Sequence, residues 1–443
     1  MTNAWRKMHP VKRLGWVTLT SLLVLALGVV WDNWGDLLGP QAPNTAVTAP
    51  ATEAQIEQGR YLALAGNCMA CHTTRGGTPF AGGRRIDTPF GGVYSSNLPP
   101  DPETGLGRWT AQDFWQAMHR GRSKDGRLLT PAFPYNHTSV ITRQDSDAIL
   151  AWLRTLPPVV QAQPAHNLVW PVGTQPALAV WRSLFFEPTP FQADKAQTAE
   201  WNRGAYLVQG LGHCAACHSP RNALGASGAV NDLSGGLMPV VNWYAPDLTR
   251  DTESGMASTP LAEIVRLLRT GASNTAQTSG PMGEVVQHSL QHLNEADLQA
   301  MAVYLQSRAQ STAQPTAKNQ AARISLQVAT QGAKVYEKQC LQCHGEQGEG
   351  VKTASGEVAY PALAGNRAVL LNDPTNLVQL VLYGSYGPAT QGHPRPFGMP
   401  PAVLELDDRD IAAVLTHLRT RWGNQASEVT PLQVNRIRAA TDQ

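Results

Sequence analysis

Six cysteines and three histidines carry the clearest chemical signal in this sequence. The cysteines form three pairs with two residues between the thiols and a histidine directly after: Cys68, Cys71 and His72; Cys214, Cys217 and His218; Cys340, Cys343 and His344. This spacing sets two thiols one helical turn apart, where they can add to the vinyl groups of one haem, and brings the next imidazole to the iron. The sequence therefore predicts three covalently bound c-type haems, with each histidine as an iron ligand.

A single Cys-x-x-Cys pair is also typical of a zinc site or of a redox-active disulfide. Here the pair occurs three times, each copy is followed by histidine, and no cysteine is left over. The repetition favours haem over both alternatives.

The opposite face of each iron is a separate question, because a thioether ligand raises the reduction potential and a second imidazole lowers it. Met282 lies in a GPMG segment and Met399 in a GMP segment, both in predicted loops before a predicted helix. Met282 is 12 positions before Asn294 (294 minus 282), and Met399 is 8 before Asp407 (407 minus 399). We predict that these methionines bind the second and third irons.

The first motif has no methionine in the corresponding loop. Phe133 lies 12 positions before Asp145 (145 minus 133), and phenylalanine cannot bind iron. His137 follows on the same loop, and Met118 lies on the preceding predicted helix. We predict His137 as the sixth ligand, with Met118 or an open position as alternatives, since a methionine on an amphipathic helix more often fills a core.

Each haem motif has a short helical segment before it and an amphipathic helix long after it. The lead-in segments read QGRYL from 58, RGAYL from 203 and QGAKVY from 331. Each closing helix has a predicted cap followed by apolar residues at helical spacing: Asp145 before Ile149, Trp152, Leu153 and Leu156; Asn294 before Leu298, Met301, Ala302 and Leu305; Asp407 before Ile411, Val414, Leu415 and Leu418. A pattern repeated three times indicates repeated domains.

Length and composition agree with a loop-rich, mainly α protein. The chain has 443 residues, which suits three domains at about 100 to 200 residues each. Charged residues make up 15%, there are 39 Gly and 32 Pro, and no alternating pattern of sandwich length competes. We predict three tandem cytochrome c-like domains after a transmembrane helix: 1–31 cytoplasmic stub and anchor, 32–54 linker, 55–160 first domain, 161–198 connector, 199–308 second domain, 309–325 linker, 326–424 third domain and 425–443 tail.

The N-terminus predicts a membrane anchor. Arg6, Lys7, Lys12 and Arg13 precede an uncharged apolar stretch, 14–31, which is long enough to cross most of a bilayer. Positive flanking residues hold the N-terminus in the cytoplasm and send the rest across. A signal peptide is the alternative, but its apolar region is usually shorter and small residues follow it closely. We expect a retained anchor in the inner membrane, with the haem domains on the periplasmic side.

The remaining sequence excludes some functions. The 35 Lys and Arg nearly balance the 33 Asp and Glu, so no electrostatic case for nucleic acid arises. The sequence shows no nucleophile paired with a base, phosphate loop or dinucleotide fingerprint. Arg75 and Arg221 follow haem motifs and are candidate propionate partners, although a surface arginine is the more frequent meaning. Substrate oxidation is therefore expected on another chain.

Several further segments carry a family resemblance that covers roughly residues 54–440. They are TPFG (88–91), DPETGLGRW (101–109), WNRGAYL (201–207), GHCAACHSPRN (212–222), YPALAGN (360–366) and WGN (422–424). With the three haem motifs, they resemble the three-haem cytochrome c subunit of bacterial membrane-bound dehydrogenases.

The resemblance implies a function and a set of partners. Such subunits take electrons from a catalytic subunit that oxidises alcohols, aldehydes, sugars or sugar acids at the periplasmic face, sometimes beside a small subunit, and pass them to ubiquinone. The catalytic partner holds pyrroloquinoline quinone, flavin, or molybdenum with iron–sulfur clusters. A free-standing electron relay to an oxidase, or a haem enzyme that uses an open first iron, would be a different class of function.

Phe133 is a departure that bears on the choice of partner. Alcohol and gluconate dehydrogenase subunits usually have methionine there, whereas AFPY (132–135) followed by His137 is similar to the cytochromes of molybdenum hydroxylases, including membrane aldehyde dehydrogenases. The run 184–186 (LFF) before Trp201 is similar in the same way. The resemblance therefore favours a molybdenum aldehyde dehydrogenase as partner, with quinone alcohol or flavin sugar dehydrogenases as alternatives.

Overall fold

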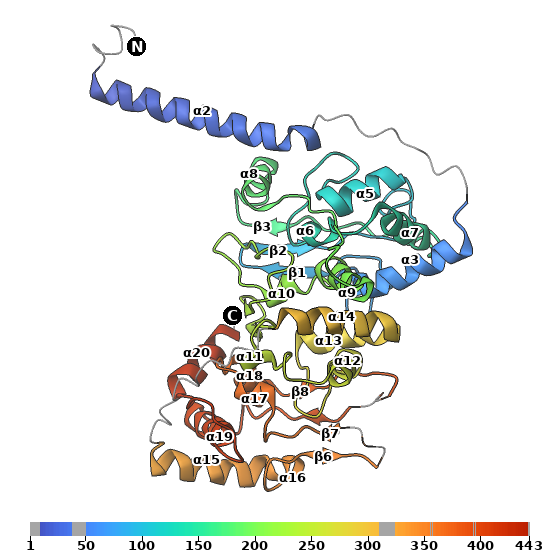
Figure 1. Ribbon diagram of the computed structural model, residues 1–443. Helices are drawn as coiled ribbons and strands as arrows, with labels where there is room; N and C mark the ends of the chain where they lie inside the picture. The colour runs from blue at the N-terminus through green and yellow to red at the C-terminus, as the bar shows by residue number, and fades with distance from the viewer. Residues whose placement is uncertain are drawn as a thin grey trace.

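The structure is a computed structural model that describes residues 9–37, 50–309 and 324–441, except 355, 357, 393 and 395 (Figure 1). Most of the predicted linkers 32–54 and 309–325 lie outside the described residues, as do Arg6 and Lys7. The predicted mainly helical class is confirmed. The helices are α2 (Pro10–Leu37), α3 (Glu53–Ala65), α4 (Cys68–Cys71), α5 (Ala111–Arg120), α6 (Tyr135–Thr138), α7 (Arg143–Leu153), α8 (Gln175–Phe185), α9 (Ala199–Gln209), α10 (Ala215–His218), α11 (Asp251–Ser254), α12 (Leu261–Thr270), α13 (Pro281–His288), α14 (Glu295–Arg308), α15 (Leu326–Gln339), α16 (Leu341–His344), α17 (Arg367–Leu370), α18 (Thr375–Tyr383), α19 (Asp408–Thr420) and α20 (Pro431–Thr441).

Three structural units repeat one helix pair. A lead-in helix packs across a closing helix in each: α3 with α7 in the first unit, α9 with α14 in the second, and α15 with α19 in the third. At each crossing the lead-in helix carries a glycine. A Cβ added to Gly59, Gly204 or Gly332 would lie 1.8, 1.9 or 2.3 Å from a backbone oxygen of the closing helix. Side chains are excluded at these distances, so the helices approach backbone to backbone.

The closing helices bury the predicted apolar faces. The four predicted positions in α14 and the four in α19 are buried, as are Ile149 and Leu153 in α7. Trp152 and Leu156 are only half-buried, and Leu156 lies beyond the end of α7, so the first predicted face is confirmed in part. Asn294 and Asp407 cap α14 and α19 as predicted, because their side chains accept hydrogen bonds from the first-turn amides. The predicted cap Asp145 is wrong. Thr142 caps α7 by accepting from the amide of Asp145, so the helix begins earlier and Asp145 lies in its first turn.

The strands are short and antiparallel. β1 (Arg85–Thr88), β2 (Gly91–Tyr94) and β3 (Asn167–Leu168) form one sheet in that order. The other pairs are β4 (Gly236–Met238) with β5 (Trp243–Ala245), β6 (Val351–Lys352) with β7 (Val358–Tyr360), and β8 (Ser385–Tyr386) with β9 (Gly398–Met399). Because β3 and α8 lie within the predicted connector 161–198, that segment is built into the fold.

Two tyrosines join the first and second units reciprocally. Tyr61 of α3 donates to Asp297 of α14 at 2.6 Å and accepts from the amide of the cap Asn294 at 3.3 Å. In the opposite direction Tyr206 of α9 donates to Asp145 of α7, and the amide of the cap Thr142 donates to the Tyr206 hydroxyl at 3.0 Å. Each lead-in helix thus binds the start of the other unit's closing helix.

The third unit differs at this position. Lys334 stands two residues after the crossing glycine, where the other lead-in helices have tyrosine, and Tyr336 instead donates to the backbone oxygen of Gly345 at 2.6 Å. The third unit meets the second through other contacts, such as the paired hydrogen bonds of 2.8 Å between Asn376 and the backbone of Tyr244. The segment predicted as a tail from 425 forms α20, and Val434 is buried in the third core.

Within the described residues, α2 is the one helix long and apolar enough to cross a membrane, over Trp16–Asn33. It continues to Leu37, so residues 32–37 belong to the helix and not to the predicted linker. Its C-terminal end lies on α8 (Figure 1), where Asn33 donates to Ser183 at 2.9 Å and to the backbone oxygen of Ala179 at 3.2 Å.

The tyrosine contacts predict a measurable contribution to stability. Tyr61→Phe and Tyr206→Phe each remove a donor to a carboxylate, an interaction that contributes about 1.5–3 kcal/mol. We expect each variant to lower the denaturant midpoint of the haem-region circular dichroism, and Tyr386→Phe, at a tyrosine that is 76% exposed, to leave it unchanged. Equal midpoints in all three variants would show that the reciprocal contacts contribute nothing.

Candidate haem sites

Each haem motif begins just after its lead-in helix, and its histidine is oriented by a backbone carbonyl. The three Cys-x-x-Cys pairs lie in or next to the one-turn helices α4, α10 and α16. Nδ1 of His72, His218 and His344 lies 2.8, 2.8 and 2.9 Å from the backbone oxygen of Ser96, Pro246 and Pro361, respectively. When Nδ1 donates to a carbonyl, the neutral ring carries its single N–H proton on Nδ1, and the lone pair of Nε2 is available to a metal. This is a common arrangement for metal-binding histidine.

The three histidines have the charge state that iron binding requires. Burial lowers the pKa of His72, His218 and His344, and this effect outweighs the carbonyl hydrogen bonds, which raise it. Each imidazole is therefore neutral at neutral pH. A metal ligand must be neutral imidazole, so these residues fit an iron ligand without further rearrangement.

The cysteines fit haem better than the two alternatives. All six are free of disulfides in the described structure. Structural zinc takes four protein ligands, and no group of three or more His, Cys, Asp or Glu side chains suited to a metal ion occurs in the described part of the chain. The three sites are thus consistent with three haem groups.

The predicted methionine ligands lie in the same cores as the haem cysteines. The predicted loop positions are wrong, because Met282 lies in the first turn of α13 and Met399 lies in β9. Met282 and Cys214 both pack against the second core. Met399, in β9, and Cys340 both pack against the third core. In the first core Cys68 and Phe133 both pack against the buried cluster. Counted from the true cap Thr142, Phe133 lies nine positions before the closing helix (142 minus 133), between the eight of Met399 and the twelve of Met282.

His137 is a buried histidine with one nitrogen in use. It is 1% exposed, and Nδ1 lies 2.9 Å from the backbone oxygen of Gln209, at the end of α9. Nε2 is buried and has no hydrogen-bond partner among the described residues. Burial lowers the pKa of His137 to about 4, aided by the nearby His213 and Arg221 and opposed by the Gln209 hydrogen bond. The ring is neutral, with Nε2 available as a ligand atom.

Met118 has a packing role in the structure. It is 7% exposed on α5 and belongs to the first core, and its backbone oxygen accepts a hydrogen bond from Thr138. This is the core-filling role expected of a methionine on an amphipathic helix.

Comparison with known proteins agrees with this geometry. The cytochrome c family profile matches residues 202–309 and 329–422, which contain the second and third haem motifs. A gluconate 2-dehydrogenase cytochrome c subunit from Pantoea cypripedii is 36% identical over 95% of this chain and 95% of its own length. The chain belongs to the cytochrome c subunits of bacterial membrane-bound dehydrogenases.

Other relatives serve different dehydrogenases. The cytochrome c subunit of alcohol dehydrogenase (quinone) from Gluconacetobacter polyoxogenes is 36% identical over 89% of this chain and 86% of its own length. A nicotinate dehydrogenase subunit from Pseudomonas putida is 40% identical over 90% of this chain, but the chain spans only 34% of that protein's length. These relatives identify the chain as an electron-transfer cytochrome c subunit. They belong to different dehydrogenases and so do not single out one catalytic partner.

The first unit of this cytochrome subunit lies outside the profile matches, so the structure supplies the argument for it. It repeats the glycine crossing at Gly59, the carbonyl-bound histidine His72 and the Cys-x-x-Cys turn. These features are the ones that the second and third units share. The first unit is therefore a third copy of the same haem-binding arrangement.

Arg84 is a site residue that the sequence did not reveal. It donates to the backbone oxygen of Ala70, within the first haem motif, at 2.5 Å. Arg221 makes the equivalent contact with Ala216 in the second motif at 2.6 Å, whereas Arg75 is exposed. Arg84 lies 12 positions after its motif (84 minus 72), whereas Arg221 lies three after its own (221 minus 218). Because the two spacings differ, the sequence alone does not show that these arginines make equivalent contacts.

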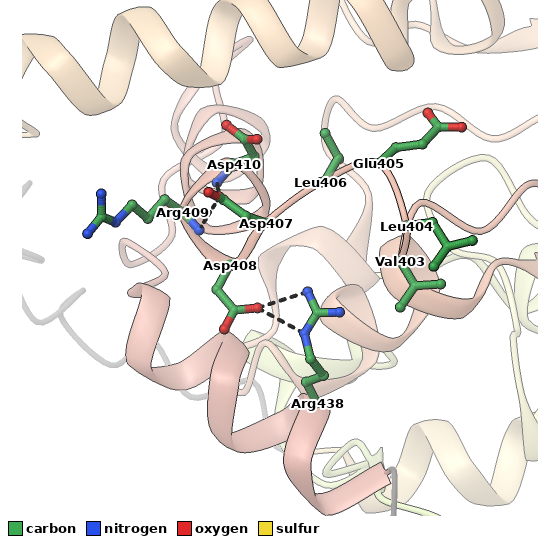
Figure 2. A pocket seen from close by; sticks show the side chains of 9 residues that line it. All are labelled: Val403, Leu404, Glu405, Leu406, Asp407, Asp408, Arg409, Asp410 and Arg438. Carbon is green, nitrogen blue, oxygen red and sulfur yellow. Dashed lines mark hydrogen bonds and ion pairs between the residues drawn. The ribbon is translucent and has the colours of Figure 1, made fainter.

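A surface hollow on the third unit has a structural explanation (Figure 2). It is lined by residues 403–410 and Arg438. Asp407 caps α19, Asp408 forms an ion pair of 2.8 Å with Arg438 of α20, and Asp410 accepts from Gln331 at 2.5 Å. Glu405 also accepts from Gln339 at 3.0 Å, so each carboxylate that lines the hollow has a partner within the third unit.

The three sites predict the mass of the purified cytochrome subunit. We expect the chain mass plus three haems, and a pyridine haemochrome of c type, because all six cysteines lie in equivalent motifs. Replacing both cysteines of one motif, as in Cys214→Ala with Cys217→Ala, should remove one haem mass. Two haems on the unaltered chain would contradict the three-site interpretation.

Proposed function

We propose that the chain relays electrons through three c-type haems from the catalytic subunit of a periplasm-facing dehydrogenase to ubiquinone in the inner membrane. The observation that carries this proposal is the threefold geometry in which a lead-in helix presents two cysteines and a carbonyl-bound histidine to one core. When bound, haem supplies one-electron exchange at its iron. The chain's residues hold the group, orient its ligands and shield it with the three packed cores.

We propose domains at 55–160, 199–308 and 326–424, with α2 as a retained anchor. The apolar window of α2 and the positive residues before it support this orientation. The contacts of Asn33 with α8 also support retention, since they make the end of α2 part of the folded protein.

His137 is the sixth ligand of the first iron in this proposal. Support comes from the second unit, where Ser289 holds the corresponding place five positions before the cap (294 minus 289; 142 minus 137). Ser289 donates to the backbone oxygen of Ala65 in α3 at 3.1 Å, as His137 does to Gln209 in α9. A serine is enough for that contact. The histidine adds a second nitrogen, the buried Nε2, which is able to bind iron.

The catalytic partner we favour is a molybdenum aldehyde dehydrogenase with iron–sulfur clusters. Phe133, which packs against the first core, and His137, four positions later in the chain, support it, since this pair is the one that resembles the cytochromes of molybdenum hydroxylases. A quinone alcohol dehydrogenase or a flavin sugar or gluconate dehydrogenase is the second candidate, favoured by the relatives that are 36% identical over most of the chain.

Ligand variants test the assignment at each iron. We expect His137→Ala to keep three covalent haems but to convert one low-spin centre to high spin, because Nε2 is lost. Met282→Ala and Met399→Ala should each convert a different centre. Magnetic circular dichroism counts bis-imidazole centres in the unaltered protein, and one is expected.

The matched control for His137 is Ser289→Ala, which removes the corresponding contact between units without removing a ligand. It should leave all three centres low-spin. Three His and Met centres in the unaltered protein would rule out His137 and direct attention to Met118, whereas a native five-coordinate centre would support a ligand-binding haem enzyme.

The partner is tested by purifying the protein in detergent from its native membrane. We expect a large catalytic subunit to copurify and ubiquinone analogues to be reduced only when that subunit's substrate is present. Molybdenum in the complex and activity on aldehydes would support the favoured partner, while pyrroloquinoline quinone or flavin would select the second candidate. Oxidation of aldehydes or alcohols by the isolated chain would contradict the division of labour.

A further inference from the structure

The segment that joins the first two units has an exposed apolar side. Val169 and Trp170, in the turn before α8, are 57% and 85% exposed, and Val180 and Leu184 of α8 are 45% and 62% exposed. Pro176 is also exposed. We call these five residues the α8 patch. Tryptophan and aliphatic side chains together on an exposed surface are unusual for a face that meets only water.

The α8 patch follows the geometry of the helix. Residues 176, 180 and 184 are four apart, so they form one stripe along α8. The opposite side carries the buried Leu178 and Arg182, which are 5% and 3% exposed. The helix is therefore amphipathic in an unusual sense, because its outward stripe is apolar and its inward side holds the charge.

Arg182 is the only charged residue between positions 167 and 186, and it is directed away from the α8 patch. Its guanidinium donates to the backbone oxygen of Arg120 at 2.6 Å and to the side-chain oxygen of Asn33 at 3.3 Å. It also lies 4.6 Å from the ring centre of Phe186 and 5.4 Å from that of Tyr135. With this charge engaged inside the protein, the outer surface of α8 is uncharged.

The α8 patch is continuous with the helix that enters the membrane. Ala179 and Ser183 of α8 contact Asn33 of α2. They directly precede Val180 and Leu184, so the contact stripe and the exposed stripe are neighbours on one helix. Asn33 ends the apolar window of α2, which places α8 at the depth where α2 leaves the hydrocarbon.

We propose that the α8 patch lies in the headgroup region of the bilayer and seats the first haem unit on the membrane surface. An uncharged apolar stripe and an exposed tryptophan six residues before it in the chain form the composition that favours this region, where the indole ring is stable. The proposal rests on α2 as an anchor for its geometry. It assigns to the connector a membrane contact in addition to the anchor, so that the first unit has a fixed face toward the lipid.

Photo-crosslinking to lipid tests this contact on the full-length holoprotein. The probe is a phosphatidylethanolamine with a diazirine near the head of its acyl chain, in vesicles of phosphatidylethanolamine and phosphatidylglycerol. Peptide mass spectrometry should find lipid adducts on 167–186 and on α2. The control peptide contains Leu404, which is apolar and 96% exposed but lies on the third unit, and it should carry none. Val180→Glu with Leu184→Glu should remove the adducts from 167–186 and keep those on α2.

The outcomes separate the contact from the anchor. Adducts on α2 without adducts on 167–186 would overturn the proposal and leave the anchor in place. Adducts on 167–186 of a chain whose mature mass lacks α2 would support the contact and refute the anchor, and adducts on neither would refute both. Adducts that the isolated chain shows and the complex with its catalytic subunit loses would identify that subunit as the occupant and overturn the lipid assignment.

Discussion

The backbone contact between the lead-in and closing helices is the constraint on which each haem site depends. Glycine in the interior of a helix costs about 1 kcal/mol relative to alanine, yet Gly59, Gly204 and Gly332 all lie within lead-in helices. The close approach that they permit fixes where the lead-in helix ends, and the haem motif starts there. It also fixes where the closing helix starts, which in turn places the loop before it. One contact thus sets the position of ligands on both sides of the iron.

The contact between the first and second units also depends on the start of a closing helix. Asp297 is bound by both Arg203 of its own unit, at 2.8 Å, and Tyr61 of the first unit. Burial raises the pKa of Asp297, but these hydrogen bonds outweigh it and lower the pKa below its usual value. The carboxylate is therefore charged at neutral pH, and it accepts hydrogen bonds from both Arg203 and Tyr61. A side chain in the first turn of a closing helix consequently also aligns a neighbouring unit.

The sequence predicted local structure better than the contacts between units. The caps Asn294 and Asp407 and the apolar faces of α14 and α19 are local patterns, and the structure has them as expected. The cap of α7 was misplaced because Thr142 and Asp145 are both good cap residues three positions apart, and only the backbone shows which one begins the helix. The tyrosine contacts had a weak local signal, the shared Gly-x-Tyr, but their partners are far away in the sequence.

The distance along the chain between Tyr61 and its partner has a consequence for how the protein is made. Tyr61 and Asp297 are 236 positions apart, whereas Tyr206 and Asp145 are separated by 61. A chain that emerges N-terminus first can close α3 on α7 as soon as the first unit is complete. The hydroxyl of Tyr61 then remains hydrated until most of the second unit, which contains Asp297, has been synthesised. The first lead-in helix to be made is thus among the last to gain its full set of partners, and the two units can dock only after both have been synthesised.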